Sequence, residues 1–233
     1  MVDPVAYRTP SEIAATAVNA GVAKSRASAV ALVVLGFLAG SFIAMAAVAS
    51  HTVSYALGAW AGPSAVKLIS GLVFSVGIVM VIIGGAELFT GNSLMVMALL
   101  DRRIRLGALL RNWVIVYLSN MAGALFVAWL YHETGLWQPA DGASAQALVM
   151  TAIRKSSLEF WPAFFRGVLC NWLVCMGVWM SYSADDVLGR IAPLAMAVSA
   201  FIMCGAEHSV ANMFYIPIGL MLSSAPAAQC FAS

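Results

Sequence analysis

Hydrophobic residues gather along the chain into five long units separated by short polar segments. Residues 29–50, 113–131 and 167–184 are uninterrupted apolar stretches without a charged side chain. Each is long enough for a helix to cross a hydrocarbon core of about 30 Å. We therefore expect these three stretches to be transmembrane helices.

The other two units are longer than a membrane span, and each is interrupted by charge. Residues 68–100 cover 33 positions with Glu87 as their only charged side chain. As one helix they would extend over about 50 Å, too far for a single crossing. In the fifth unit, residues 191–222, Glu207 and His208 interrupt the apolar pattern in the same way. The pattern predicts that both units contain a broken helix.

The two interruptions share one sequence pattern. Residues 85–92 read GAELFTGN and residues 205–212 read GAEHSVAN, so G-A-E-x-x-x-[GA]-N occurs twice, 120 residues apart. With three spanning units in the first copy, the second copy starts on the opposite side of the membrane. Inverted repeats whose broken helices meet near the midplane are typical of transporters and channels. We place the repeats at about 29–131 and 160–233, within one transmembrane domain of residues 29–233.

Composition supports a membrane protein and excludes other classes. Hydrophobic residues make up 62% of the chain and charged residues only 9%, whereas roughly a quarter of an average soluble domain is charged. The net charge of +2 and the lack of a basic cluster interleaved with aromatics argue against a nucleic-acid partner. The histidines and cysteines do not gather at metal-ligand spacing, so no metal and no cofactor are expected.

The distribution of basic residues predicts the orientation in the membrane. Residues 9–12 read TPSE, a capping box that begins an amphipathic helix within residues 1–28. Lysines and arginines concentrate before the first unit and between the second and third. Because cytoplasmic loops are enriched in these residues, we expect the N-terminus and its helix to be cytoplasmic.

Three segments together resemble the signature segments of the formate/nitrite transporter family: GGAELFTGN at 84–92, CNWLVCMGVWMSYS at 170–183, and CGAEHSVANMFYIPIGL at 204–220. The resemblance implies an all-α, aquaporin-like protomer with helices two and five broken, assembled as a homopentamer with one pore per protomer. It also implies a sixth helix, which residues up to 233 do not include. We expect that the intact protein is longer, or that a neighbouring protomer supplies this wall.

The resemblance also assigns residues to the pore. It implies that His208 projects into the pore midpoint, where an imidazole titrates near working pH and offers a proton or hydrogen bond to the passing anion. Thr90 would face His208 from the first break, and Asn171 would line the pore beside it. Lys155 would attract anions in the outer vestibule.

Further positions would form apolar constrictions and hold the broken loops. Constrictions strip hydration with bulky apolar side chains, and the family pattern places them at Phe74, Ile78 and Leu88 on the cytoplasmic side and at Phe89, Val174 and Phe201 on the outer side. Glu87 and Glu207 would repel an anion inside the pore. We expect them to accept hydrogen bonds from freed backbone N–H groups and, with Asn92 and Asn212, to act as scaffold.

These observations predict a channel or transporter rather than an enzyme. An unprotonated anion would meet a large desolvation barrier at the apolar rings, whereas protonation beside His208 gives a neutral weak acid. We expect proton-linked passage of a small monovalent anion across the bacterial inner membrane, with formate favoured and nitrite or hydrosulfide as alternatives. The expected partners are the chain itself, membrane lipid and this anion. A remote alternative is an intramembrane serine hydrolase, because Ser209 adjoins His208.

Overall fold

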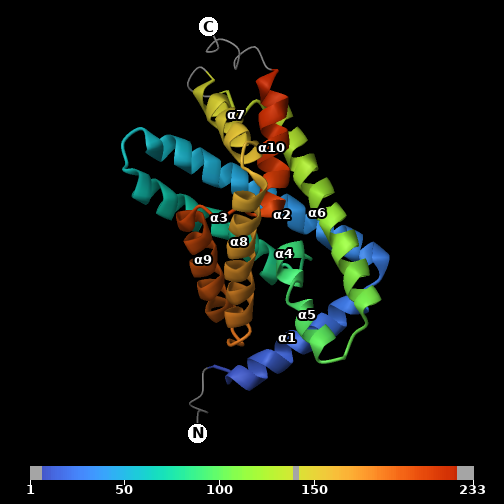
Figure 1. The fold of residues 1–233 in the computed structure, drawn as a ribbon. Coiled ribbons are helices and arrows are strands. Elements are labelled where there is room, and N and C mark those ends of the chain that lie inside the picture. The colour runs from blue at the N-terminus through green and yellow to red at the C-terminus, as the bar shows by residue number, and fades with distance from the viewer. Residues whose placement is uncertain (1–6, 139–141, 225–233) are drawn as a thin grey trace.

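The computed structural model describes residues 7–138 and 142–224, and all regular structure in these ranges is helical (Figure 1). Five helices are apolar and long enough to cross a membrane: α2 (Ala29–Gly58), α3 (Pro63–Ile83), α6 (Leu106–Thr134), α8 (Phe160–Ser181) and α9 (Val187–Cys204). Five shorter helices complete the fold in these ranges: α1 (Pro10–Ser25), α4 (Phe89–Asn92), α5 (Met95–Leu100), α7 (Ala143–Ser156) and α10 (Ser209–Ser223). The prediction of an all-α membrane protein is confirmed.

In both over-long units the chain leaves the helix near the repeated motif. In the first unit α3 ends at Ile83 and α4 begins at Phe89; in the second, α9 ends at Cys204 and α10 begins at Ser209. Gly85 and Gly205 have φ angles of 69° and 70°, in the left-handed region that glycine adopts without steric cost. The pattern places a glycine where the chain must turn.

Each break is held by a backbone hydrogen bond to a neighbouring spanning helix. The N–H of Glu87 donates to the carbonyl of Leu35 on α2 at 3.1 Å, and the N–H of Glu207 donates to that of Arg166 on α8 at 3.3 Å. These contacts satisfy polar backbone groups that lipid could not. The two repeats therefore place equivalent loops against equivalent helices.

Helix α1 begins as the sequence predicts. Thr9 is its N-cap, and the Thr9 and Glu12 side chains form the reciprocal bonds of a capping box. These bonds, first from the backbone of Thr9 and then from its hydroxyl, lower the pKa of the Glu12 carboxyl. Helix α1 ends at Ser25, and Lys24 lies in its last turn.

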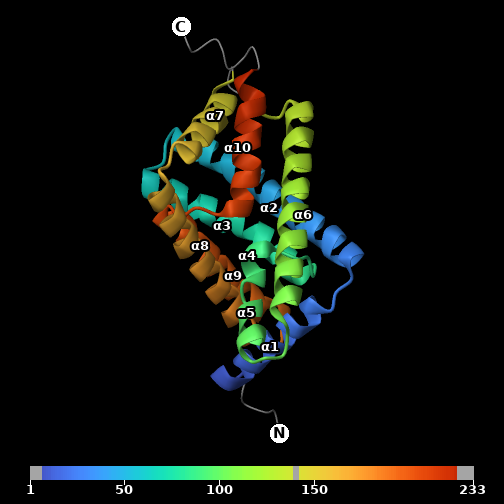
Figure 2. The ribbon, with the colours of Figure 1, turned by 45° about the vertical axis from the view of Figure 1, so that its right-hand side comes forward.

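Helix α7 is not predicted by the hydrophobic pattern. It is amphipathic and packs along α10, with Gly219 allowing the close approach of Ala152. Figures 1 and 2 place α7 and the C-terminal part of α10 at one end of the molecule and α1 and α5 at the opposite end. Lys155 lies in the last turn of α7.

Helix α6 crosses α2 at close range, and this contact positions the first break. Gly40 of α2 lies against the backbone of Asn120, and Gly123 of α6 lies against the backbone of Phe37. A side chain at either glycine would meet backbone atoms, so only glycine permits this spacing. The contact brings Asn120 within reach of the loop that contains Glu87.

Candidate functional site: the pore centre and its vestibule

His208 joins the two broken helices. It is the N-cap of α10, where its Nδ1 accepts a hydrogen bond from the Ala211 N–H at 3.1 Å, and its Nε2 lies 3.3 Å from Thr90 Oγ1. Both side chains are buried, at 4% exposure each. The structure therefore brings together the two residues that the resemblance assigned to the pore centre, 118 positions apart in the chain.

The hydrogen bonds define the tautomer of a neutral His208 ring. Because Nδ1 accepts from a backbone N–H, the ring proton must be on Nε2, which then donates toward Thr90. Protonating Nδ1 would break the cap and put a positive charge at a helix N-terminus, which the helix dipole disfavours. The ground state is thus a neutral imidazole that offers one N–H.

Asn171, expected to line the pore beside His208, bonds to the first break. Its Nδ2 donates to Ser93 Oγ at 3.0 Å, just after α4. Its Oδ1 is buried and has no hydrogen-bond partner among the described residues. Asn171 therefore links α8 to the first break and presents an unpaired acceptor there.

Phe74 lies with a different group of constriction residues from the one predicted. Phe74 and Phe201 meet edge to face, with ring centroids 5.9 Å apart, and the Phe201 ring stacks on His208 at 5.7 Å. Phe74 thus belongs with Phe201 on the α7 side of the centre, and its assignment to the opposite constriction was wrong. The assignment came from the family resemblance, and the sequence does not show that α3 is tilted across the molecule (Figures 1 and 2).

Phe89 also lies on the other side from the one predicted. Its ring packs against Tyr117 and Trp113 at 4.9 and 6.1 Å, on the half of α6 nearest α1 and α5 (Figure 1). Its assignment to the same constriction as Phe201 was therefore wrong. Three further predicted constriction residues, Ile78, Leu88 and Val174, are buried in the main hydrophobic core.

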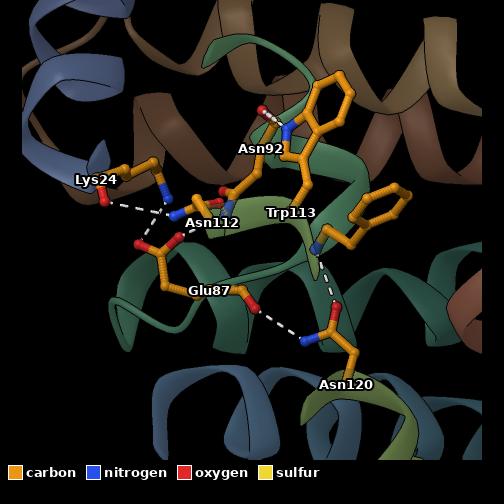
Figure 3. Close-up of polar contacts among 7 residues, drawn as sticks. Lys24, Glu87, Asn92, Asn112, Trp113 and Asn120 are labelled. Atoms are coloured by element: carbon orange, nitrogen blue, oxygen red, sulfur yellow. Dashed lines mark hydrogen bonds and ion pairs between the residues drawn. The ribbon is translucent and has the colours of Figure 1, made fainter. Parts of the chain in front are cut away.

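Glu87 is the centre of a polar network (Figure 3). Lys24 Nζ lies 2.8 Å from its Oε1, and Asn92 Nδ2 donates to its Oε2 at 2.7 Å. Asn92 Nδ2 also donates to Asn112 Oδ1 at 2.9 Å, and the carbonyl of Asn92 accepts from the Trp113 indole at 3.0 Å. Through these contacts the loop is linked to α1 and α6.

Asn120 on α6 holds the same loop through its backbone. Its Nδ2 donates to the carbonyls of Glu87 and Gly36, at 2.9 and 2.8 Å, while its Oδ1 accepts from the Phe89 N–H at 2.9 Å. Asn112 and Asn120 are fully buried. Sequence reasoning missed both, although an asparagine inside an apolar span is itself a signal of a specific role.

Glu207 occupies the matching position in the second break. Lys155 Nζ lies 2.6 Å from its Oε2, and Asn212 Nδ2 donates to the same oxygen at 2.9 Å. Lys155 also lies 5.4 Å from the centroid of the Tyr215 ring. The expectation that backbone N–H groups bind the two carboxylates was wrong in detail: within the described ranges a lysine and an asparagine bind each. The physical reason is that other side chains accept from the N–H groups at the starts of α4 and α10, namely Asn120 from Phe89 and His208 from Ala211.

A cavity of about 740 Å³ opens at the α7 end and reaches the centre. His208 and the Phe74 and Phe201 rings line its inner part, and α2, α3, α7 and α8 contribute its walls. Lys155 lines it as well. Within residues 7–138 and 142–224, no three histidine, cysteine or acidic side chains are arranged to hold a metal ion.

Two buried breaks joined by a histidine and a threonine, with a vestibule that carries basic residues beside them, define a membrane channel or transporter. The family model for formate/nitrite transporters matches residues 11–232, and the chain belongs to that family. Its members among the matches are channels and transporters rather than enzymes. The hydrolase alternative is set aside, since His208 directs its two ring nitrogens to Ala211 and Thr90.

Individual relatives extend over most of the chain. It is 36% identical to a probable formate transporter of Methanothermobacter thermautotrophicus, over 97% of this chain and 88% of the relative. It is 38% identical to the formate channel FocA of Haemophilus influenzae, over 91% and 75%. Among solved structures, a pentameric formate channel with formate bound superposes with a TM-score of 0.77 at 31% identity, covering 86% of this chain and 78% of that one.

Proposed function

We propose that this chain forms a homopentameric channel for a small monovalent weak-acid anion, with formate favoured, and that each protomer contains its own pore. Formate channels among the relatives and the pentameric solved structure support the substrate and the assembly. The basic loops support an inner-membrane orientation with a cytoplasmic N-terminus, which puts α7 and the cavity outside. Nitrite and hydrosulfide remain the alternative substrates.

The contact between His208 and Thr90 is the observation that carries this proposal. It is the point where the two repeats meet, and His208 also lines the cavity. An anion arriving there finds the Nε2–H of His208 and the hydroxyl of Thr90 as hydrogen-bond donors. These replace part of the hydration that the anion loses beside Phe201 and Phe74.

The tautomer of His208 determines how a proton can be transferred to the anion. A neutral His208 with its proton on Nε2 stabilises the anion by a hydrogen bond but cannot protonate it without becoming an imidazolate. Proton transfer requires the imidazolium, whose formation frees Nδ1 from the Ala211 N–H. We propose that this charged state is transient: as the anion occupies the centre, Nδ1 takes up a proton from the aqueous cavity, because the anion compensates the charge, and Nε2 passes its proton to the anion.

Flux of formate, nitrite and hydrosulfide into proteoliposomes tests the proposal. Wild-type protein should conduct at least formate, with faster flux at lower external pH, and Thr90→Val should reduce the rate because it removes one donor. The matched control is Thr52→Val, which removes an exposed hydroxyl that bonds only within its own helix. Absence of flux from intact wild-type pentamers would overturn the proposal.

A further inference from the structure

Four basic residues line the vestibule, and they are not equivalent. Lys155 is bound to Glu207, the one acidic residue that lines the cavity within the described ranges. Its charge is therefore compensated at 2.6 Å. Lys67, Arg154 and Arg166 line the same cavity, are exposed, and have no ion pair in the described part of the chain.

The uncompensated charge of the vestibule thus resides outside the Lys155 ion pair. A concave, partly apolar wall focuses the field of such charges and raises the local concentration of anions. At the same time Lys155 is held by Glu207, whose Oε2 also accepts from Asn212 Nδ2, and this pairing makes Lys155 part of the loop scaffold. Attraction of the anion and support of the loop are then separate tasks of separate residues.

The chemistry of the two arginines indicates which class of anion the vestibule would bind best. A guanidinium offers two parallel N–H donors that match the two oxygens of a planar anion, whereas an ammonium acts as a point charge. Arg154 is already oriented, because its Nη2 donates to Thr151 Oγ1 at 3.1 Å. Its remaining N–H groups are directed by a side chain that is partly fixed on α7.

We propose that Arg154 and Arg166 form an outer capture site for planar anions with two oxygens, such as carboxylates or nitrite. The site holds the anion in the vestibule before it reaches His208. Lys67 adds charge without geometric preference. Hydrosulfide, with one acceptor atom, is attracted by the charge but cannot accept both parallel N–H donors of a guanidinium, here called the fork. This inference rests on the proposed function, since it names the ligand class of the same pore.

Initial flux rates against anion concentration separate charge from geometry. In right-side-out membrane vesicles, Arg154→Gln with Arg166→Gln should raise the KM for all three anions by about 3- to 10-fold at low salt. The maximal rate should remain within about twofold, because the pore centre is unchanged. High salt should weaken wild-type capture toward the variant, since exposed charges are screened.

Arg154→Lys with Arg166→Lys retains the charge and removes the fork. The KM for formate and nitrite should rise by roughly two- to threefold while that for hydrosulfide stays at the wild-type value. Arg105→Gln, an exposed arginine at the opposite end of the molecule, is the matched control and should leave all three KM values unchanged. Pentamers of every variant are verified by size-exclusion chromatography before flux is measured.

The outcomes distinguish this inference from the proposed function. An unchanged KM in the double glutamine variant would overturn the capture site while leaving the channel intact. An equal shift for all three anions in the double lysine variant would overturn the fork and its ligand class. Wild-type protein that conducts none of the anions would overturn the proposed function itself.

Discussion

The two breaks share a motif but differ in how firmly they are held. At the first, Glu87 binds Lys24 and Asn92, and two asparagines of α6 add further bonds to the loop. At the second, Glu207 binds Lys155 and Asn212, and the Oδ1 of Asn212 is buried without a hydrogen-bond partner in the described residues. The glutamate and asparagine of the motif therefore have many hydrogen-bond partners at the first break and few at the second.

The difference corresponds to different tasks. The first loop presents Thr90, whose hydroxyl needs a fixed position but no change of charge. The second presents His208, whose proposed proton link requires the ring to leave its cap on Ala211. We infer that the first loop is the rigid half of the centre and the second the half that can respond. Equivalent substitutions in the two loops should therefore differ in their effects on stability and flux.

The largest effect is expected at Asn120. Asn120→Leu keeps the volume but leaves the carbonyl of Glu87 and the N–H of Phe89 without their partner, and it removes a second bond from the helical carbonyl of Gly36. Each buried unpaired group costs roughly 1–3 kcal/mol, so the loss should reach about 3 kcal/mol or more. Thermal unfolding in detergent measures it, with Asn19→Leu on the exposed face of α1 as control. Equal melting temperatures for the two variants would contradict the network.

The second-largest difference between the two loops is expected when the charge of each glutamate is removed. Glu87→Gln strands the partly buried Lys24 ammonium and should destabilise the pentamer by about 2 kcal/mol, below the range for fully buried pairs because Lys24 is a quarter exposed. Glu207→Gln should destabilise it too, but it also releases the charge of Lys155 into the vestibule and should lower the KM for formate. Melting temperatures and flux kinetics of both variants check this. A KM that rises in Glu207→Gln would count against the separation of tasks.

The amides that follow the carboxylates should show the smallest contrast. Asn92→Ala loses bonds to both Glu87 and Asn112 and should cost about 2 kcal/mol, while Asn212→Ala loses one bond and should cost about 1 kcal/mol. Denaturation of the two variants under one condition compares them directly. A larger loss at Asn212 would mean that the second loop is the better supported one.

The repeated motif made the centre predictable. Glycine, glutamate and asparagine recur at fixed spacing because each break needs a turn, a carboxylate and an amide at the same places, and this repetition is visible in one chain. The pairing of Thr90 with His208 followed from the family resemblance. Lys24 and Lys155 as partners of the two glutamates did not, because they come from α1 and α7, distant in sequence and outside the apolar units.

Depth and side in the membrane were harder to predict. Phe74 and Phe89 were assigned to the wrong ends because the assignment rested on the family resemblance, and the sequence does not give the tilt of α3 or the path of the first break. Helix α2 extends to Gly58, past the predicted end at residue 50. Its polar residues His51 and Ser54 line the vestibule and bond to Ser144 and Ser70, so they are accommodated within the helix. Residues 225–233, including the expected end of the second repeat, lie outside the described residues.

The pH dependence of formate flux in two His208 variants tests the central claim most directly. His208→Asn keeps a side chain that can cap α10 and donate toward Thr90 but cannot titrate, whereas His208→Phe removes both. We predict that the asparagine variant conducts at a rate independent of pH and that the phenylalanine variant is nearly closed. An asparagine variant that retains the wild-type rise in flux at low pH would contradict the account.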